Sequence, residues 1–108
     1  MKRGDIVTVS LSGDYGKPRP ALVIQSNNFM EHTSITVLPI TSTIVNAPLL
    51  RITFEPDDKN NLQKISQVMI DKIMTVKNDK VGKPFGFITE KQLHEIERSL
   101  LLFLGIAK

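Results

Sequence analysis

The stretch TEKQLHEIERSLLLFLG, residues 89–105, decides the fold class of this 108-residue chain, because its apolar residues recur at helical spacing. Thr89 and Gln92 fit a capping box at its beginning, and Gly105 stands where the residue after a helix C-terminus belongs. The stretch therefore predicts an amphipathic helix at the end of the chain. The residues of its apolar stripe, which follow one another at intervals of three and four, are Leu93, Ile96, Leu100 and Leu104.

Before this helix the chain is a series of short β-branched or apolar runs separated by turn residues, a pattern typical of strands. The run 21–25 predicts a strand buried on both faces, and Pro39 predicts an edge, a bulge or a bend in the run 35–41. The segment 13–20, with its glycines and prolines, predicts an exposed loop. The predicted strands cover residues 6–11, 21–25, 35–41, 49–54, 64–70 and 84–87.

Together these elements predict an α+β fold, in which a small, strongly bent β-sheet or barrel is closed by the C-terminal helix. The length suits one domain over residues 1–108. The run 100–104 is apolar over more than a full helical turn, so part of it faces away from its own core. Two interpretations stay open for this run: a deeply buried helix end or a dimer interface.

The composition excludes several kinds of site. The chain has no cysteine and two histidines, which excludes disulfides, thiolate zinc sites, iron–sulfur clusters, a cysteine nucleophile and a three-histidine metal site. His32 and His94 stand alone, and we interpret both as structural or surface residues. The net charge of +3 permits a polyanionic partner without demanding one. No run is apolar enough for a signal peptide or a membrane span, so we expect a cytoplasmic protein with no membrane association.

Three strand ends carry residues that suit phosphate chemistry. Arg19 lies between two prolines, which stiffen the backbone and preorder a guanidinium whose fork can bind two phosphate oxygens. The alternative for Arg19 is an ion pair with a carboxylate. The hydroxyls of residues 41–43 follow an apolar strand, where a Ser/Thr turn is the alternative. Asp71 and Lys72 follow another apolar strand, where a surface ion pair is the alternative.

Short blocks of sequence occur in a specific order. The chain begins with RGDIV (3–7), and a glycine-containing loop leads into RPALVI (19–24). The strand VLPITS (37–42) ends in hydroxyls, SQVMIDKIMTV (66–76) follows, and the last helix ends in LGI (104–106). In this order, and over nearly the whole chain, the blocks resemble the MazF/PemK family of toxins.

The resemblance implies an SH3-like β-barrel with a C-terminal helix, usually assembled as a homodimer. It implies a metal-independent endoribonuclease, without a cofactor, that cuts single-stranded RNA, commonly messenger RNA, at short preferred sequences. It also implies neutralisation by a small cognate antitoxin that occupies the RNA groove.

Three residues match the family's functional positions. Arg19 corresponds to the arginine after the first loop, Thr41 to the catalytic threonine, and Asp71 to an acidic position that acts as the base in some members. The chain departs from the family at Met69, where some members have an arginine, and in the loop 13–20, which lacks the histidine that some members place there. A mechanism based on an arginine and a threonine is therefore the one that carries over.

RNA itself can supply the nucleophile, because the 2′-hydroxyl lies next to the scissile phosphate. We expect Arg19 to stabilise the phosphorane, Thr41 to contact a phosphate oxygen or position the 2′-hydroxyl, and Asp71 to take the proton. The expected products carry a 2′,3′-cyclic phosphate and a 5′-hydroxyl. Tyr15 is expected to stack on a base, with a plain loop tyrosine as the alternative. The residues expected to bind RNA are Tyr15, Lys17, Ser42, Lys72, Lys77 and Lys80, with Lys83 adding positive charge.

Two other functions are compatible with the same sequence. The first is a gyrase-inhibiting toxin of the same fold, which acts by protein binding through its C-terminal helix. The second is a ribonuclease-like protein without activity that serves only as a partner or regulator. The presence of Arg19 and Thr41 favours the nuclease.

Overall fold

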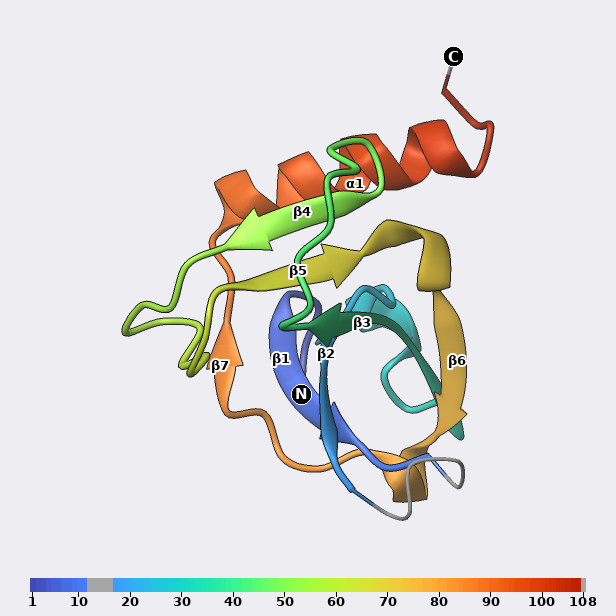
Figure 1. Ribbon diagram of the computed structural model, residues 1–108. Helices are drawn as coiled ribbons and strands as arrows, with labels where there is room; N and C mark the ends of the chain where they lie inside the picture. The colour runs from blue at the N-terminus through green and yellow to red at the C-terminus, as the bar shows by residue number, and fades with distance from the viewer. Residues whose placement is uncertain (12–16, 108) are drawn as a thin grey trace.

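The computed structural model describes residues 1–11 and 17–107 and contains a curled antiparallel sheet with one helix, α1 (Glu90–Phe103), packed at one end (Figure 1). The sheet order is β4-β5-β3-β2-β1-β7, and β6 pairs with β3 off this path. Among the described residues, strands are connected by the 3-10 turns η2 (Asn27–Phe29), η3 (Ile70–Lys72) and η4 (Asn78–Lys80). The strands are β1 (Asp5–Val9), β2 (Arg19–Val23), β3 (Ser34–Thr41), β4 (Arg51–Phe54), β5 (Ser66–Met69), β6 (Met74–Lys77) and β7 (Gly86–Phe87).

The predicted α+β architecture is confirmed, and each predicted strand is present with shifted bounds. The first strand is shorter than expected, because Ser10 leaves the ladder and donates its N–H to the Lys80 carbonyl (2.9 Å). Gln25 lies beyond β2 and uses its side chain instead, accepting from Thr36 N (2.9 Å). Strand β6 was not predicted, because the residues after the predicted strand 64–70 were interpreted only through Asp71, Lys72 and the family block 66–76. Of the predicted loop 13–20, residues 12–16 lie outside the described part of the chain.

Pro39 lies at a bend, one of the positions that its ring permits. Strand β3 pairs with β6 through Ser34–Val37, whereas its end, Ile40 and Thr41, pairs with β5. Pro39 falls between these two stretches, where the neighbour on one side of the strand changes. Proline has no N–H to donate, so this interval is a suitable place for it.

The core has two layers, because β1, β2 and β3 are buried on both faces. One layer is built around Ile6, Leu22 and Leu38, and the helix residue Ile96 covers it. The other layer holds the alternate residues of the same strands, such as Val7, Ala21, Val23 and Val37. Side chains of successive strand residues point to opposite faces, which explains this division. The apolar run 21–25 therefore predicted its burial correctly.

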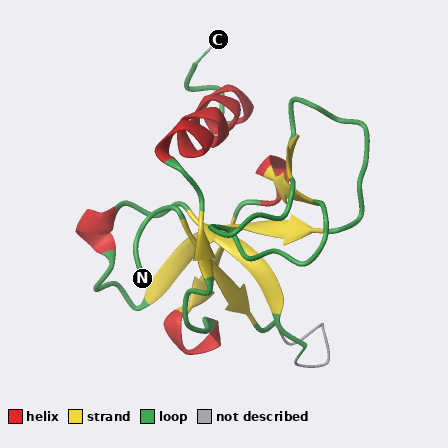
Figure 2. Cartoon of the chain, turned by 90° about the vertical axis from the view of Figure 1, so that its left-hand side faces the viewer, coloured by secondary structure: helices red, strands yellow, loops and turns green. Residues whose placement is uncertain are grey.

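Helix α1 begins and ends as its sequence predicts. Thr89 Oγ1 accepts from Gln92 N (3.2 Å) while Gln92 Oε1 accepts from Thr89 N (2.9 Å), which completes the capping box. Gly105 adopts φ 76° just after the helix, in the left-handed region that favours glycine. An ion pair between Arg3 and Glu97 joins the helix to the beginning of the chain. Figure 2 shows the helix standing on one end of the strands.

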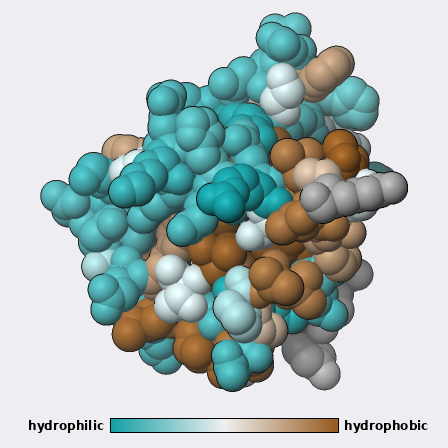
Figure 3. Space-filling view, turned by 90° about the horizontal axis from the view of Figure 1, so that it is seen from above, coloured by the Kyte–Doolittle hydropathy of each residue, from teal (hydrophilic) through white to brown (hydrophobic). Residues whose placement is uncertain are grey.

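The apolar end of α1 is not buried in its own chain, so the interpretation of residues 100–104 as a deeply buried helix end is wrong. Side chains from Leu101 to Leu104 are 40–53% exposed, because the helix extends past the sheet that it covers. The face seen from above in Figure 3 is hydrophilic on one side and hydrophobic on the other. Within residues 1–11 and 17–107, no helix is both long and apolar enough to cross a membrane.

Candidate active site

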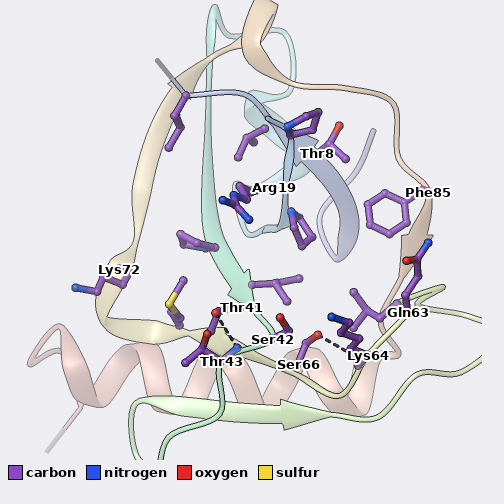
Figure 4. Close-up of a pocket in the computed structure, with 18 of the residues that line it drawn as sticks. Thr8, Arg19, Thr41, Ser42, Thr43, Gln63, Lys64, Ser66, Lys72 and Phe85 are labelled. Atoms are coloured by element: carbon purple, nitrogen blue, oxygen red, sulfur yellow. Dashed lines mark hydrogen bonds between the residues drawn. The ribbon is translucent and has the colours of Figure 1, made fainter. Parts of the chain in front are cut away.

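A cavity of about 990 Å³ opens where β2 begins and β3 ends. These strands are antiparallel neighbours, with Ala21 opposite Pro39, so the first residue of β2 lies beside the last residues of β3. Counting by twos along each strand places Arg19 and Thr41 on the same face of the sheet. Both residues line the cavity, together with Ser42. Figure 4 shows Arg19 in the middle of the hollow and the hydroxyls of Thr41, Ser42 and Ser66 on one side of it.

The described residues that line the cavity include several cationic side chains. These are Arg19, Lys64 and Lys72, and none of the described lining residues is an aspartate or a glutamate. Lys64 precedes β5 and Lys72 follows it in η3, so they lie on opposite sides of the hollow in Figure 4. Cationic side chains around a concave surface concentrate anionic ligands there. The cavity therefore suits a phosphate-bearing substrate.

The hydroxyls at the end of β3 are held by local bonds. Thr41 Oγ1 accepts from Thr43 N (3.1 Å), so the Ser/Thr turn foreseen as the alternative for residues 41–43 is present. A hydroxyl that accepts such a bond can still donate its own proton, so the turn and a phosphate contact are compatible. Ser66, buried at the start of β5, donates to Lys64 O (2.8 Å). This bond fixes the chain just before β5, next to the hydroxyls of β3.

Gln67 secures the loop that follows these hydroxyls. Its side chain, only 3% exposed, accepts from Val45 N (3.1 Å) and donates to Val45 O (3.0 Å) and Thr53 Oγ1 (3.1 Å). A buried amide with all these partners fixes the path of the backbone after Thr43. No local pattern indicates this role of Gln67, because its partners lie 14 and 22 positions away.

Asp71 does not line the cavity, although its neighbour Lys72 does. Its carboxylate accepts from Arg51 Nε (3.1 Å) and Arg51 Nη2 (3.2 Å), which is a two-pronged ion pair. The hydrogen bonds from the Arg51 guanidinium hold the pKa of the Asp71 carboxyl below its ordinary value. An ion pair was the foreseen alternative for Asp71, and its partner is Arg51 from β4. The role of Asp71 as the base stays a prediction.

The other described residues that were predicted to bind RNA do not line the cavity. Lys17 is exposed just before β2, whereas Lys77 and Lys80 are exposed at and after the end of β6, and none of the three lines the cavity. Tyr15 lies outside the described residues. His32 is exposed and accepts from Ser34 N (3.2 Å) through Nδ1, in agreement with a surface role. No group of three or more potential metal ligands occurs in the described part of the chain.

Several cavity residues were missed by the sequence analysis. Asn61, Gln63 and Lys64 come from the connection between β4 and β5, and Phe85 comes from the segment before β7. No local pattern in the sequence shows that the connection between β4 and β5 faces Arg19. Phe85 is the aromatic ring among the described lining residues, a place that the sequence analysis had given to Tyr15.

The comparisons with known proteins agree on one family. A family model described as "PemK-like, MazF-like toxin of type II toxin-antitoxin system" matches residues 2–104. The chain is 44% identical to the probable endoribonuclease MazF of Mycolicibacterium smegmatis over 108 residues, 99% of each chain.

Solved structures show the same fold. An endoribonuclease in complex with its cognate antitoxin, from a mycobacterial species, superposes with a TM-score of 0.82 at 22% identity, over 100% of this chain and 98% of the other. The Mycobacterium tuberculosis toxin MazF-mt6 superposes with a TM-score of 0.80 at 22% identity, over 94% of this chain and 96% of the other.

Proposed function

The chain belongs to the PemK-like, MazF-like family of toxins of type II toxin–antitoxin systems, and we infer from this membership that it is an endoribonuclease. The observation that supports this most directly is the cavity, in which Arg19 and the strand-end hydroxyls meet among cations and no carboxylates in the described lining. Such a surface is complementary to a phosphodiester and to the extra negative charge of its transition state.

The substrate of this proposal is single-stranded RNA, above all messenger RNA, and the reaction needs no metal. The 2′-hydroxyl oxygen attacks the adjacent phosphorus as its proton passes to a base. The bond from phosphorus to the 5′-oxygen then breaks, and that oxygen takes up a proton. The products carry a 2′,3′-cyclic phosphate and a 5′-hydroxyl, so atoms and charge balance without an added cofactor.

In this proposal, two of the residues that line the cavity assist the reaction at the phosphate. Arg19 stabilises the charge that develops on the phosphorane, because its guanidinium keeps its charge and can bind two oxygens at once. Thr41 donates a hydrogen bond to a phosphate oxygen or holds the 2′-hydroxyl in line. Ser42 and Lys72, which line the same cavity, bind the RNA backbone beside them.

The test of this function is cleavage of a long, mixed-sequence single-stranded RNA by the purified protein in excess EDTA. We expect discrete fragments whose 5′ ends accept phosphate from a polynucleotide kinase without prior dephosphorylation. Intact RNA under these conditions would reject the proposal. Loss of DNA supercoiling by gyrase on addition of the protein would then support the gyrase-inhibiting alternative, which the endoribonuclease relatives do not favour.

Asp71 is proposed as the base, and its ion pair with Arg51 makes that role testable. We expect Asp71→Asn to lower kcat/KM by about 10²–10⁴-fold. Because Arg51 lowers the pKa of Asp71, the acidic limb of the native pH–rate profile lies below about 3.9, the ordinary aspartate value. The limb disappears in the variant.

Thermal melting separates this role from a purely structural one. The lowered pKa means that the ionised carboxylate stabilises the fold above about pH 4, and this stabilisation is lost as the pH falls through the folded-state pKa. A variant that melts earlier at neutral pH but keeps its kcat/KM within about threefold of native rejects Asp71 as the base. Asp79→Asn, which neutralises an exposed acid in η4, is the matched control.

We also propose that the protein is a cytoplasmic homodimer that a small cognate antitoxin neutralises. The exposed apolar end of α1, from Leu101 to Leu104, is the surface that supports a dimer, since small domains rarely leave such surface in water. Native mass spectrometry of the purified protein is expected to show twice the 12.1 kDa mass of one chain.

A further inference from the structure

The cavity has a second wall, across the hollow from Lys72, that the proposed reaction does not use. Its members are Gln63 and Lys64, from the connection between β4 and β5, and Phe85, from the segment before β7. In Figure 4 the three side chains stand together on the right of the hollow, across from Lys72. This base wall, as we name these three residues, combines a ring, an amide and an ammonium group.

The Phe85 ring is held in a fixed place. Its backbone N–H donates to Ile6 O (2.9 Å), and its carbonyl accepts from Asn61 Nδ2 (2.7 Å). The side chain is half-buried and packs against the core layer that contains Ile6 and Ile96, so part of the ring borders the cavity. A ring that is already positioned loses little conformational freedom when a flat ligand stacks on it.

The turn that carries Gln63 and Lys64 is equally fixed. Asn60 is 1% exposed, accepts from Asp57 N (3.1 Å) and Leu62 N (3.0 Å) through Oδ1, and donates to Glu55 O (2.9 Å). The Lys64 carbonyl, four residues on, accepts from Ser66 (2.8 Å). Gln63 and Lys64 therefore lie on a short segment whose two ends are both held by hydrogen bonds.

These contacts distinguish the base wall from an ordinary solvated loop. Single-stranded RNA is bound by aromatic rings that stack on bases, by polar side chains that bond to base edges, and by cations on the phosphates. The base wall supplies one group of each kind within a cavity that also holds Arg19 and Thr41.

We propose that the base wall is a nucleobase subsite, which binds one unpaired base next to the scissile phosphate and contributes to the cleavage sequence. The base stacks on Phe85, the Gln63 amide bonds to its edge, and the Lys64 ammonium neutralises the adjoining phosphate. The proposal rests on the proposed ribonuclease function, and it assigns residues to sequence selection that the cleavage chemistry leaves without a role.

The test is a double-mutant cycle between protein and RNA. Each protein variant is assayed on two RNAs. The first is a short cleavable RNA, and the second is the same RNA with an abasic nucleotide at one position beside the cut. For the native protein we expect one abasic position to lower kcat/KM by about tenfold or more. Phe85→Leu lowers kcat/KM on the intact RNA to a similar extent, and the abasic penalty at that position disappears.

Further variants keep the test decisive. Phe85→Tyr retains the ring and therefore the abasic penalty, whereas Gln63→Ala changes the preferred base at that same position. Phe29→Leu removes an exposed ring outside the cavity and leaves both the cleavage rate and the abasic penalty unchanged. If Phe85→Leu fails to fold, as judged by its thermal melt, Gln63→Ala decides the question, because Gln63 is exposed.

The outcomes separate the subsite from the function. If the native protein cleaves RNA, and Phe85→Leu and Gln63→Ala show the same abasic penalty as the native protein, the subsite is rejected. The ribonuclease function stands in that case. Absence of cleavage by native protein overturns the ribonuclease, and the same cycle is then measured as binding of uncleavable 2′-O-methyl RNA. An abasic penalty on binding that Phe85→Leu removes supports the subsite, and equal binding by all variants overturns it.

Discussion

Arg19→Ala is expected to lower kcat/KM for RNA cleavage by about 10²–10³-fold, the loss that follows removal of one preorganised donor to a developing anion. Arg19 begins β2 and lines the cavity beside the end of β3, where the scissile phosphate is proposed to lie. Its side chain is exposed, so the free energy of unfolding should change by about 1 kcal/mol or less. Single-turnover cleavage and a urea melt measure the two quantities separately.

Two further variants identify what the arginine supplies. Arg19→Lys keeps the charge but not the two-pronged guanidinium, so its activity should lie between those of native protein and Arg19→Ala. Arg98→Ala removes the same charge from an exposed position on α1 that does not line the cavity, and it should leave cleavage within about twofold of native. Equal activity of Arg19→Ala and Arg98→Ala would remove Arg19 from the mechanism.

Gly86→Ala is expected to destabilise the fold by about 2–3 kcal/mol, because the new methyl group has no room. A Cβ at this position meets the carbonyl oxygen of Asn60 at 2.2 Å and its carbonyl carbon at 2.6 Å. These are backbone atoms that cannot turn aside. The Asn60 N–H is bonded to Asp57 Oδ1 (2.7 Å), and Phe87 N is bonded to Lys59 O (3.0 Å), so the turn is tied down on both sides.

A neighbouring glycine provides the control for this prediction. A Cβ at Gly82 meets Thr8 Oγ1 at 2.3 Å, an equally close contact, but that atom ends a side chain that can rotate away. Gly82→Ala should therefore change the free energy of unfolding by less than about 1 kcal/mol. Urea denaturation of the two variants compares them directly, and equal destabilisation would show that the Asn60 backbone yields as readily as a side chain.

The end of the chain shows how much of the fold could be predicted from local sequence. Thr89, Gln92 and Gly105 cap the helix as predicted, because each acts within about four residues of itself. The predicted apolar stripe packs against the core as far as Leu100. Leu104 is exposed because the sheet does not reach it. Periodicity predicts which face of a helix is apolar, but not how much of that face the sheet covers.

The candidate site was predicted only in part, for a related reason. Arg19 and Thr41 were found through their strand-end positions and their family motifs, and the structure places both at one cavity. Asp71 was also found through a family motif. Its carboxylate is bonded to Arg51, which lies 20 positions away and is not indicated as a partner by any local pattern. Phe85 and Gln63 escaped notice because a phenylalanine between turn residues and a glutamine in a loop have no distinctive local pattern.

The sequence by itself determined most elements of this protein: six of the runs that become strands, the caps of the helix, and the burial of the run that begins at Ala21. Those properties depend on hydrogen bonds and side-chain alternation between residues a few positions apart. The tertiary structure decided the rest, by pairing β2 with β3 and folding the turn at Asn60 against Gly86. Contacts between distant segments depend on the packing of the whole sheet, and that packing puts an arginine, hydroxyls and an aromatic ring into one cavity.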